Sequence, residues 1–332
     1  MQHVLFSVII PVYNRPDELS ELLQSLVGQH FKDFEVLVVD DGSSVPCDKI
    51  VSRYSDDLNV HYYYKLNTGP GLSRNYGAER ASGDYLIILD SDCILPDTYF
   101  DAVISELNMA PADAFGGPDK AHASFSNVQK AINYSMTSFF TTGGIRGGKK
   151  KMDKFYPRSF NMGVRRDVYQ ALGGFSNMRF GEDIDFSIRI FKNGYGCRLF
   201  PDAWVYHKRR TDWRKFFKQV YNSGIARINL YKKYPESLKV VHLLPAAFTV
   251  GVLVLLLGSV LCPWSLTLLL LYAFLVFLDS TVKNRNALIG LYSVFAAYIQ
   301  LIGYGSGFLW ALWRRCVLKK DEFEAFKKNF YK

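Results

Sequence analysis

The sequence predicts an α/β fold with a mostly parallel sheet and flanking helices, followed by helices that associate with a membrane. Two patterns carry this prediction. Short apolar runs, typical of buried strands, alternate with helical patterns in the first third of the 332 residues. From residue 243 to residue 313 the chain is mostly apolar, and its only charged side chains are Asp279, Lys283 and Arg285. A chain of this length can hold the two parts as separate domains.

Four apolar runs of five to eight residues are expected to form strands, because they are short and rich in β-branched or aromatic side chains. Helical spacing appears between them: Leu19, Leu22 and Leu26 recur at intervals of three or four, and Pro16 suits a first helical turn. Strands that alternate with helices form βαβ units and a parallel sheet covered on both faces. The expected strands are residues 5–12, 34–40, 60–65 and 85–89, and further helices are expected at 46–54, within 69–81 and at 97–109.

Three of the expected strands run directly into polar residues. Ligands of parallel α/β sheets bind at the carboxyl ends of the strands. We therefore expect these polar residues to meet at one edge of one sheet and to form a site. They are Tyr13-Asn14, Asp40-Asp41 and the segment Asp90-Ser91-Asp92.

The segment "DSD" at residues 90–92 can be interpreted in two ways. If the extended geometry of the strand continues, Asp90 and Asp92 share one side, and a divalent cation would relieve their repulsion. Mg²⁺ and Mn²⁺ commonly bind through one or two carboxylates together with substrate phosphates. Alternatively, both side chains bond nearby backbone in a turn. The segment alone favours the turn, whereas its place at the shared sheet edge favours the cation site.

Several other polar positions admit both a structural and a functional role. Asp41 is followed by Gly42, a pair that is common in turns. Arg74 lies in a glycine-rich entry to a helix, where amides and an arginine suit phosphate, although it could be an ordinary surface charge. Glu182 and Asp183 begin an expected helix, where acidic residues are favoured and where an ionised carboxylate could serve as a general base.

Basic residues are concentrated in three places. His207 ends a strand-like segment beside three basic residues, which favours contact with an anion or its metal over a purely structural role. The loop "GGKKKMDK" at residues 147–154 could meet phosphates of an acceptor or could be a mobile basic loop. Residues 213–234 combine lysine and arginine with aromatic side chains. Such a helix commonly lies on an anionic membrane surface, and the adjacent apolar segments favour that role over nucleic-acid binding.

Together and in this order, these segments resemble the inverting GT-A glycosyltransferases of family 2. The matching blocks between residues 5 and 210 read "SVIIPVYNRPDELSELLQSLVGQHFKDFEVLVVDDGSS", "NTGPGLSRNYGAERASGDYLIILDSD", "GEDIDFSIRIFKNGYG" and "VYH". The resemblance implies a GT-A (Rossmann-like) catalytic domain with Asp183 as the base. It implies that Asp92, in the DxD motif, and His207 hold the metal. The residues that it assigns to the nucleotide are Pro11, Tyr13 and Asp41 at the base, Asp90 at the ribose or diphosphate, and Arg74 at the diphosphate.

The resemblance also implies the reaction. The donor would be a nucleotide-diphosphate sugar, the cofactor Mg²⁺ or Mn²⁺, and a single displacement with one base would invert configuration. Processive synthases of the family carry a Q-x-x-R-W motif after the base, and the sequence has none. We therefore expect transfer of a single sugar, with a lipid-linked saccharide of cell-envelope glycan assembly as the acceptor. A processive synthase that exports its polymer, or a catalytically silent membrane scaffold, are the alternatives.

The apolar end is expected to hold two membrane spans, residues 243–261 and 264–278, and a third apolar segment, residues 288–312. A third full crossing would export the basic tail, against the positive-inside rule. The third segment is therefore expected to be re-entrant or interfacial, with a bend at "GYGSG", residues 303–307. The expected domains are the catalytic domain at 1–210, a basic interfacial segment at 211–242, the membrane region at 243–313 and a basic cytosolic tail at 314–332.

The expected location is the cytosolic face of the inner membrane. The five cysteines are scattered and form no CxxC, which fits a reducing compartment. The N-terminal segment "MQHVLFSVIIPVYN" lacks the basic start and the cleavage site of a signal peptide. We therefore expect the catalytic domain to stay in the cytosol.

Overall fold

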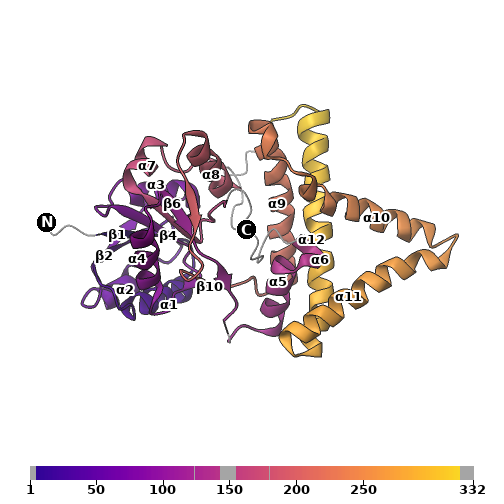
Figure 1. Cartoon of the computed structure of the whole chain (residues 1–332), viewed down its shortest axis with the longest axis horizontal. Helices are drawn as coiled ribbons and strands as arrows, with labels where there is room; N and C mark the ends of the chain where they lie inside the picture. Colours follow the sequence, from indigo (N-terminus) through magenta and orange to yellow (C-terminus); the bar gives the residue numbers. More distant parts are fainter. Residues whose placement is uncertain (1–4, 123, 143–154, 179, 322–332) are drawn as a thin grey trace. The chain divides into compact units, whose positions relative to one another are not determined.

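The computed structural model describes residues 5–122, 124–142, 155–178 and 180–321. The chain divides into two compact units, and Figure 1 shows the elements of each. Of the described residues, those up to 120 and from 155 to 207 belong to the first unit, and those from 121 to 142 and from 208 to 321 belong to the second. The second unit thus includes part of the region that the sequence prediction placed in the catalytic domain. The basic loop at 147–154 lies outside the described residues.

The first unit is built on a seven-stranded sheet of order β3-β2-β1-β4-β8-β6-β9. Strands β3, β2, β1 and β4 run parallel to one another, whereas β8 runs antiparallel to both β4 and β6. The predicted mostly parallel α/β sheet is therefore confirmed. Its strands are β1 (Phe6–Val12), β2 (Phe34–Asp40), β3 (Val60–Tyr64), β4 (Tyr85–Leu89), β6 (Ala114–Gly116), β8 (Asn161–Arg165) and β9 (Cys197–Leu199). A second, three-stranded sheet joins β5 (Cys93–Ile94), β10 (Val205–His207) and β7 (Asp119–Lys120) in that order.

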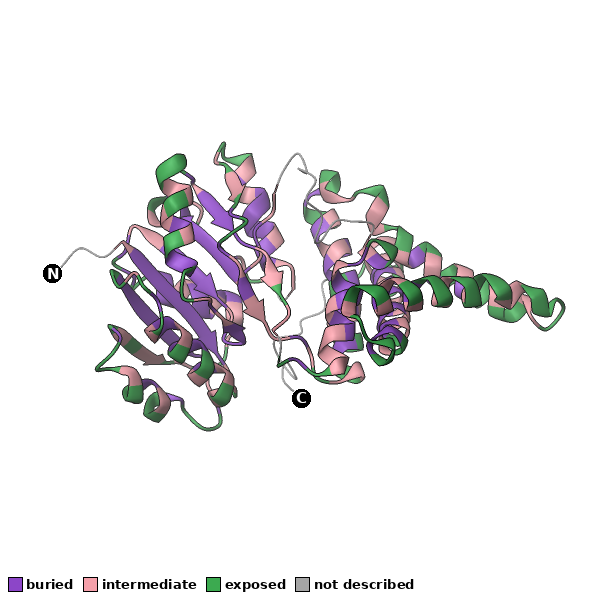
Figure 2. Ribbon diagram, turned by 60° about the horizontal axis from the view of Figure 1, so that its bottom comes forward, coloured by how far each residue is buried: buried purple, intermediate pink, exposed green. Residues whose placement is uncertain are grey.

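Helices cover both faces of the large sheet, and Figure 2 shows its central strands as buried. All seven residues of β1 are buried, because alternate side chains enter two different cores. Val8 and Ile10 belong to the core under α1 and α4, whereas Ile9 belongs to the core under α3, α7 and α8. The helices are α1 (Pro16–Val27), α2 (Asp48–Val51), η1 (Ser52–Tyr54), α3 (Pro70–Ala78), α4 (Tyr99–Met109), α7 (Arg166–Ala171) and α8 (Glu182–Lys192).

The parallel pairing brings the polar strand ends to one edge, as the sequence predicts. Val12 at the end of β1 lies opposite Asp40 at the end of β2, and β4 pairs with the other side of β1. The loops after β1 and β2 are also bonded to each other. The N–H of Asn14 donates to Ser43 Oγ at 2.9 Å, and Asn14 Oδ1 accepts the N–H of Ser44 at 2.8 Å.

The described part of the second unit is helical. Three of its stretches are long and apolar enough to cross a membrane: residues 240–258, 263–284 and 287–317. The second continues past the predicted end at residue 278, because Asp279 pairs with Lys283 one turn later (Oδ2–Nζ 2.8 Å) and extends the helix. The elements are α5 (Asn127–Thr137), α6 (Phe139–Thr142), α9 (Trp213–Lys233), η2 (Pro235–Ser237), η3 (Val240–His242), α10 (Leu244–Gly258), η4 (Pro263–Leu266), α11 (Thr267–Asn284), α12 (Ala287–Leu312) and η5 (Trp313–Val317).

Helix α12 runs without interruption through residues 303–307, so the bend that the sequence suggested is not present. The glycines there face neighbouring helices instead. A Cβ on Gly303 would lie 2.6 Å from Val220 Cγ2, and a Cβ on Gly305 would lie 2.3 Å from the carbonyl oxygen of Pro245. Small residues let the backbones of membrane helices approach closely. Because these glycines have no side chain, α9 and α10 can pack closely against a straight α12.

Candidate active site

A buried arginine joins the end of β4 to the start of α8. Arg74, in the second turn of α3, is 2% exposed. Its Nη2 donates to Asp90 Oδ1 at 2.7 Å, and its Nη1 donates to Glu182 Oε1 at 3.1 Å. The guanidinium carbon also lies 5.2 Å from the centre of the Phe175 ring. Arg74 is therefore not an ordinary surface charge, and it lies inside the helix rather than at its amino end.

Glu182 is the more buried partner of this arginine. Burial raises the pKa of Glu182 to about 7, because it outweighs the Arg74 guanidinium, which lowers the pKa, and the Asp183 carboxylate adds to the rise. When Glu182 is protonated, Asp90 is the one charged carboxylate in contact with Arg74, and when Glu182 is ionised there are two. Sequence reasoning placed Glu182 at a helix start but did not foresee this role.

Asp183 follows Glu182 in the first turn of α8 and is 7% exposed. Its Oδ2 lies 3.0 Å from Arg158 Nε, and its Oδ1 accepts the N–H of Ile184 at 2.8 Å. Gly181, just before the helix, has a φ of +82°, a conformation that glycine adopts without strain. The turn thus places the Asp183 carboxylate beside Arg158, and the backbone N–H of Ile184 fixes Oδ1.

The segment that leads to this turn is anchored by side chains from two helices. Asn75 on α3 donates from Nδ2 to the carbonyl of Phe175 at 2.8 Å and accepts the N–H of Phe175 at 2.8 Å. Arg189 on α8 donates to the carbonyls of Leu172 at 2.7 Å and Gly174 at 2.6 Å. The position of Asp183 therefore depends on α3 as well as on its own helix.

Asp92 and His207 come together through the small sheet. His207 in β10 lies opposite Cys93 in β5, so its Nε2 lies 3.2 Å from Asp92 Oδ1. The Phe160 ring stacks on the imidazole with 4.6 Å between centroids. Possible ligand atoms of Asp92, Cys93 and His207 all lie within 4.8 Å of one another. The two predicted metal ligands are therefore neighbours, and their metal role stays a prediction.

The donor atoms of this cluster suit a hard cation. Burial raises the pKa of the Cys93 thiol well above its usual range, and Asp92 adds to the rise. The thiol donates to the carbonyl of Phe160 at 3.3 Å, and a hard cation prefers oxygen ligands to sulfur. A carboxylate oxygen and an imidazole nitrogen remain. Mg²⁺ and Mn²⁺ bind through few protein groups and take their other ligands from water and phosphate. The residues therefore fit such an ion.

Sequence reasoning missed Arg15, the basic partner of Asp92. Nη1 of Arg15 donates to Asp92 Oδ2, on the carboxylate oxygen that does not face His207. Arg15 follows Asn14, whose φ of +51° turns the chain sharply after β1. Its position could have identified Arg15 as a site residue, because Arg15 lies two residues after Tyr13 at the predicted sheet edge. Arg158 had no such signal, because its loop is not periodic.

The two aspartates of "DSD" have different partners, because the extended geometry that would put them on one side does not continue past β4. The strand ends at Leu89, and the N–H of Cys93 donates to the carbonyl of Asp90 at 3.1 Å, which closes a turn. After this turn Asp90 contacts Arg74, whereas Asp92 contacts Arg15 and His207. The backbone thus forms the turn while the side chains still lie at the site.

Asp41 anchors the loop that precedes α3. Its Oδ1 accepts the N–H of Thr68 at 2.9 Å and a proton of Lys65 Nζ at 2.5 Å, and its Oδ2 accepts the N–H of Gly69 at 2.8 Å. The sequence suggested a turn interaction for the pair Asp40-Asp41, and Asp40 makes it, since its Oδ1 accepts the N–H of Ser43 at 2.8 Å. Asp41 therefore has a structural role whether or not it meets a ligand.

Pro11 and Tyr13 lie at the same edge as Asp41. Pro11 is in β1 opposite Val39, and Tyr13 follows the last residue of that strand. The structure thus brings six of the eight predicted site residues to strand ends, whereas Arg74 and Asp183 are on helices α3 and α8. Contacts join Arg74 with Asp90 and Asp92 with His207, while Asp41 and Asp183 pair with Lys65 and Arg158.

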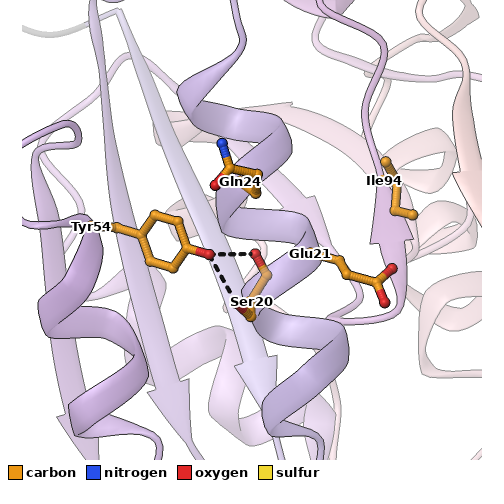
Figure 3. Close-up of a pocket in the computed structure, with 5 residues that line it drawn as sticks. All are labelled: Ser20, Glu21, Gln24, Tyr54 and Ile94. Carbon is orange, nitrogen blue, oxygen red and sulfur yellow. Dashed lines mark hydrogen bonds between the residues drawn. The ribbon is translucent and has the colours of Figure 1, made fainter.

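A hollow between α1, η1 and β5 lies apart from these groups (Figure 3). The hydroxyl of Tyr54 lies 2.8 Å from Ser20 Oγ and donates to the carbonyl of Ser20 at 3.0 Å. None of the predicted site residues lines it, so it adds nothing to the carboxylate site. Its lining residues are Ser20, Glu21, Gln24, Tyr54 and Ile94.

The raised pKa of Glu182 predicts a pH dependence of stability. Since the folded protein holds this proton more tightly than the unfolded chain, the contribution is complete below about pH 4.5 and is lost as the pH rises through 7. We expect the wild-type free energy of unfolding to fall, relative to that of Glu182→Gln, by at most ~1.4 kcal/mol per pH unit between about pH 5 and 7. Denaturant unfolding in detergent at several pH values measures this, and parallel curves for the two proteins would contradict it.

Arg15 competes with a cation for Asp92, so removing its charge should favour metal binding. We expect Arg15→Gln to bind Mn²⁺ roughly tenfold more tightly than wild type in the absence of nucleotide, since a nearby unit charge contributes on the order of 1 kcal/mol or more. Electron paramagnetic resonance of free Mn²⁺ measures this binding. Asp92→Asn should bind least. Equal affinity of wild type and Arg15→Gln would show that Arg15 does not compete.

Comparison with known proteins agrees with this geometry. Residues 7–173 match the family model described as "Glycosyl transferase family 2". An uncharacterised glycosyltransferase of Rickettsia felis is 34% identical over 141 residues, which is 42% of this chain and 22% of that protein. The Campylobacter jejuni GalNAc(5)-diNAcBac-PP-undecaprenol beta-1,3-glucosyltransferase is 34% identical over 113 residues, 33% of this chain and 37% of that one. The matched regions of the first relatives are thus a small part of their length.

Two solved structures share the fold at low sequence identity. The mannosyltransferase PcManGT of Pyrobaculum calidifontis, in complex with GDP-Man and Mn²⁺, aligns with a TM-score of 0.64 and 18% identity over 93% of this chain and 88% of that one. Residues 1–349 of TarS of S. aureus, in complex with UDP-GlcNAc, align with a TM-score of 0.51 and 22% identity over 68% of this chain and 67% of that one.

Proposed function

Because the chain belongs to glycosyl transferase family 2, we propose that it transfers a sugar from a nucleotide-diphosphate sugar to an acceptor hydroxyl, with inversion of configuration. The observation that carries the proposal is the meeting of two groups at one sheet edge. One is Asp92 with His207, and the other is Arg74 with Asp90 and the turn that bears Asp183. Together they offer a metal site, a diphosphate contact and a base.

The donor occupies the edge formed by the ends of β1, β2 and β4. We assign Pro11, Tyr13 and Asp41 to the nucleotide base, Asp90 to the ribose or diphosphate and Arg74 to the diphosphate. Similar structures in complex with UDP-GlcNAc or with GDP-Man support a nucleotide sugar as the donor, without deciding its base or sugar. Arg74 is held rigidly by two carboxylates, so it can present its charge without reorganisation.

Asp92 and His207 hold the divalent cation, for which Mg²⁺ and Mn²⁺ are the candidates. When bound, the ion stabilises the negative charge that develops on the departing diphosphate. Arg15 must leave Asp92 Oδ2 for this oxygen to become a ligand, and its guanidinium then has the diphosphate as an alternative partner.

Asp183 takes the proton from the acceptor hydroxyl as this oxygen attacks the anomeric carbon. A single displacement needs one base and no second carboxylate as nucleophile. The bond from Ile184 N–H fixes one oxygen, and Arg158 contacts the other. Arg158 therefore keeps the carboxylate in one orientation before the acceptor arrives.

The acceptor is a lipid-linked saccharide of cell-envelope assembly. Support comes from the apolar helices, which favour an acceptor in the membrane, and from the printed name of the Campylobacter relative, which is a transferase to a PP-undecaprenol-linked saccharide. The Lys/Arg-rich segments support a cytosolic side for the catalytic unit.

Asp183→Asn tests the assignment of the base. Without a proton acceptor we expect kcat to fall by roughly 10² to 10⁴, while the dissociation constant of the donor changes little. Release of UDP or GDP from its sugar conjugate, with a lipid extract as acceptor source, measures the rate. Asp101→Asn is a matched control, since this carboxylate pairs with His30 on the surface (2.9 Å) and should retain full activity. Full activity of Asp183→Asn would refute the assignment.

A further inference from the structure

Helix α9 lies along most of α12. Trp213, the first residue of α9, packs on Tyr292 with 6.1 Å between ring centroids. Further along, Gly224 abuts the backbone of α12, since a Cβ there would lie 2.1 Å from the carbonyl oxygen of Tyr304. Near the other end, Ile228 shares a core with Phe308. Any placement of α12 in a membrane must therefore place α9 as well.

This pairing argues against α12 as a membrane span. Helix α9 carries six basic side chains and no acidic one (Arg214, Lys215, Lys218, Arg227, Lys232 and Lys233). Charged side chains at the centre of a bilayer are costly and need partners there. In contrast, a basic helix at the surface of an anionic membrane is favourable. The pair α9–α12 is therefore best accommodated in the plane of the membrane surface.

Helices α10 and α11 form a hairpin whose two arms rest on different parts of α12. The α11 arm meets α12 at Gly290, where a Cβ would lie 3.0 Å from the carbonyl oxygen of Phe277. The α10 arm meets it at Gly305, beside Pro245, which is about 22 Å further along a helix. The arms then converge to the turn at residues 259–266, and Figures 1 and 2 both show the hairpin extending away from α12.

The free part of this hairpin is short and uncharged, and the two serine hydroxyls at its tip bond backbone carbonyls. From Thr249, which lies beside Gly305, to the end of α10 at Gly258 is about 14 Å of helix, close to the thickness of one leaflet, and Val252 within this stretch is still buried. The tip residues Val260, Leu261 and Trp264 are 82%, 91% and 82% exposed, and no charged residue occurs from 243 to 278. Such a tip suits hydrocarbon better than water on the far side of a membrane.

We propose that the protein is monotopic: α9 and α12 lie at the surface of the bilayer, and the α10–α11 hairpin enters one leaflet without crossing. The partner of the exposed apolar surface is thus the acyl-chain region of a bilayer. This arrangement keeps every basic segment described here on one side and replaces the two crossings expected from the sequence. It does not depend on the transfer chemistry, so it stands or falls separately from the proposed activity.

The native thiol of Cys262, exposed at the hairpin tip, tests the proposal. In Cys197→Ser/Cys316→Ser protein the other two thiols, Cys47 and Cys93, are buried. The full chain is reconstituted into sealed vesicles of phosphatidylglycerol and phosphatidylcholine. A membrane-impermeant maleimide is applied either outside alone or on both sides. We expect Cys262 to resist labelling in both cases, whereas a thiol introduced as Lys239→Cys, before α10, reacts.

Depth measurements complete the test. A fluorophore on Cys262 should be quenched most by lipids that carry the quencher deep in the acyl chain, at least threefold more than by headgroup quenchers. A fluorophore at Phe295→Cys, in the middle of α12, should show the reverse. Labelling of Cys262 when the reagent is on both sides would overturn the proposal, as would deepest quenching at residue 295 or failure of the protein to float with the vesicles.

Discussion

The site depends on one buried ion cluster, in which Arg74 holds Asp90 and Glu182. The cluster connects three elements that are distant in the sequence: the end of β4, the middle of α3 and the start of α8. Removing one member of a buried ion group is strongly destabilising, by roughly 3 to 5 kcal/mol, because the remaining charge loses its partner. The orientation of the turn with Asp183 follows from this constraint, since Asp183 is the neighbour of Glu182 on the same helical turn.

The sheet edge concentrates carboxylates, and the folded chain supplies a basic partner to each of several of them. Arg74 pairs with Asp90, Arg15 with Asp92, Lys65 with Asp41 and Arg158 with Asp183. These pairs allow acidic side chains to gather at the edge without a net repulsion that would open it. In the proposed function a ligand would enter by exchanging partners, with a cation in place of Arg15 and a diphosphate near the arginine that is released. The residues proposed to bind the ligand are thus also the ones whose ion pairs stabilise the folded sheet edge.

Much of the fold could be predicted from the sequence, because its main signals are local. The apolar runs that became β1, β2 and β4 are bounded by polar residues, and the leucines of α1 repeat at helical spacing. The shared edge followed from the general behaviour of parallel sheets. Of the site, the neighbourhood of Asp92 and His207 was anticipated by family resemblance alone, since nothing local indicates that β10 pairs with β5.

What sequence reasoning missed depends on long-range contacts. The turn after Leu89 separates Asp90 from Asp92, and only the position of Arg74 explains where Asp90 points. The partners Arg15 and Arg158 lie in irregular segments that carry no periodic signal. In the second unit, the glycines at residues 303–307 of α12 indicated a bend when only the sequence of that helix was considered. Their true role became visible only with α9 and α10 in place, because a glycine that breaks an isolated helix also permits close packing.

The proposed function requires that this edge bind a nucleoside diphosphate through a metal at Asp92. Isothermal titration of the purified full chain with UDP, GDP, CDP and dTDP, each with and without Mn²⁺, tests this binding directly. We expect that at least one of them binds, that Mn²⁺ tightens its binding by tenfold or more, and that Asp92→Asn removes this dependence while the fold is kept. Failure of all four to bind at millimolar concentration, or equal binding with and without Mn²⁺, would contradict the proposed function.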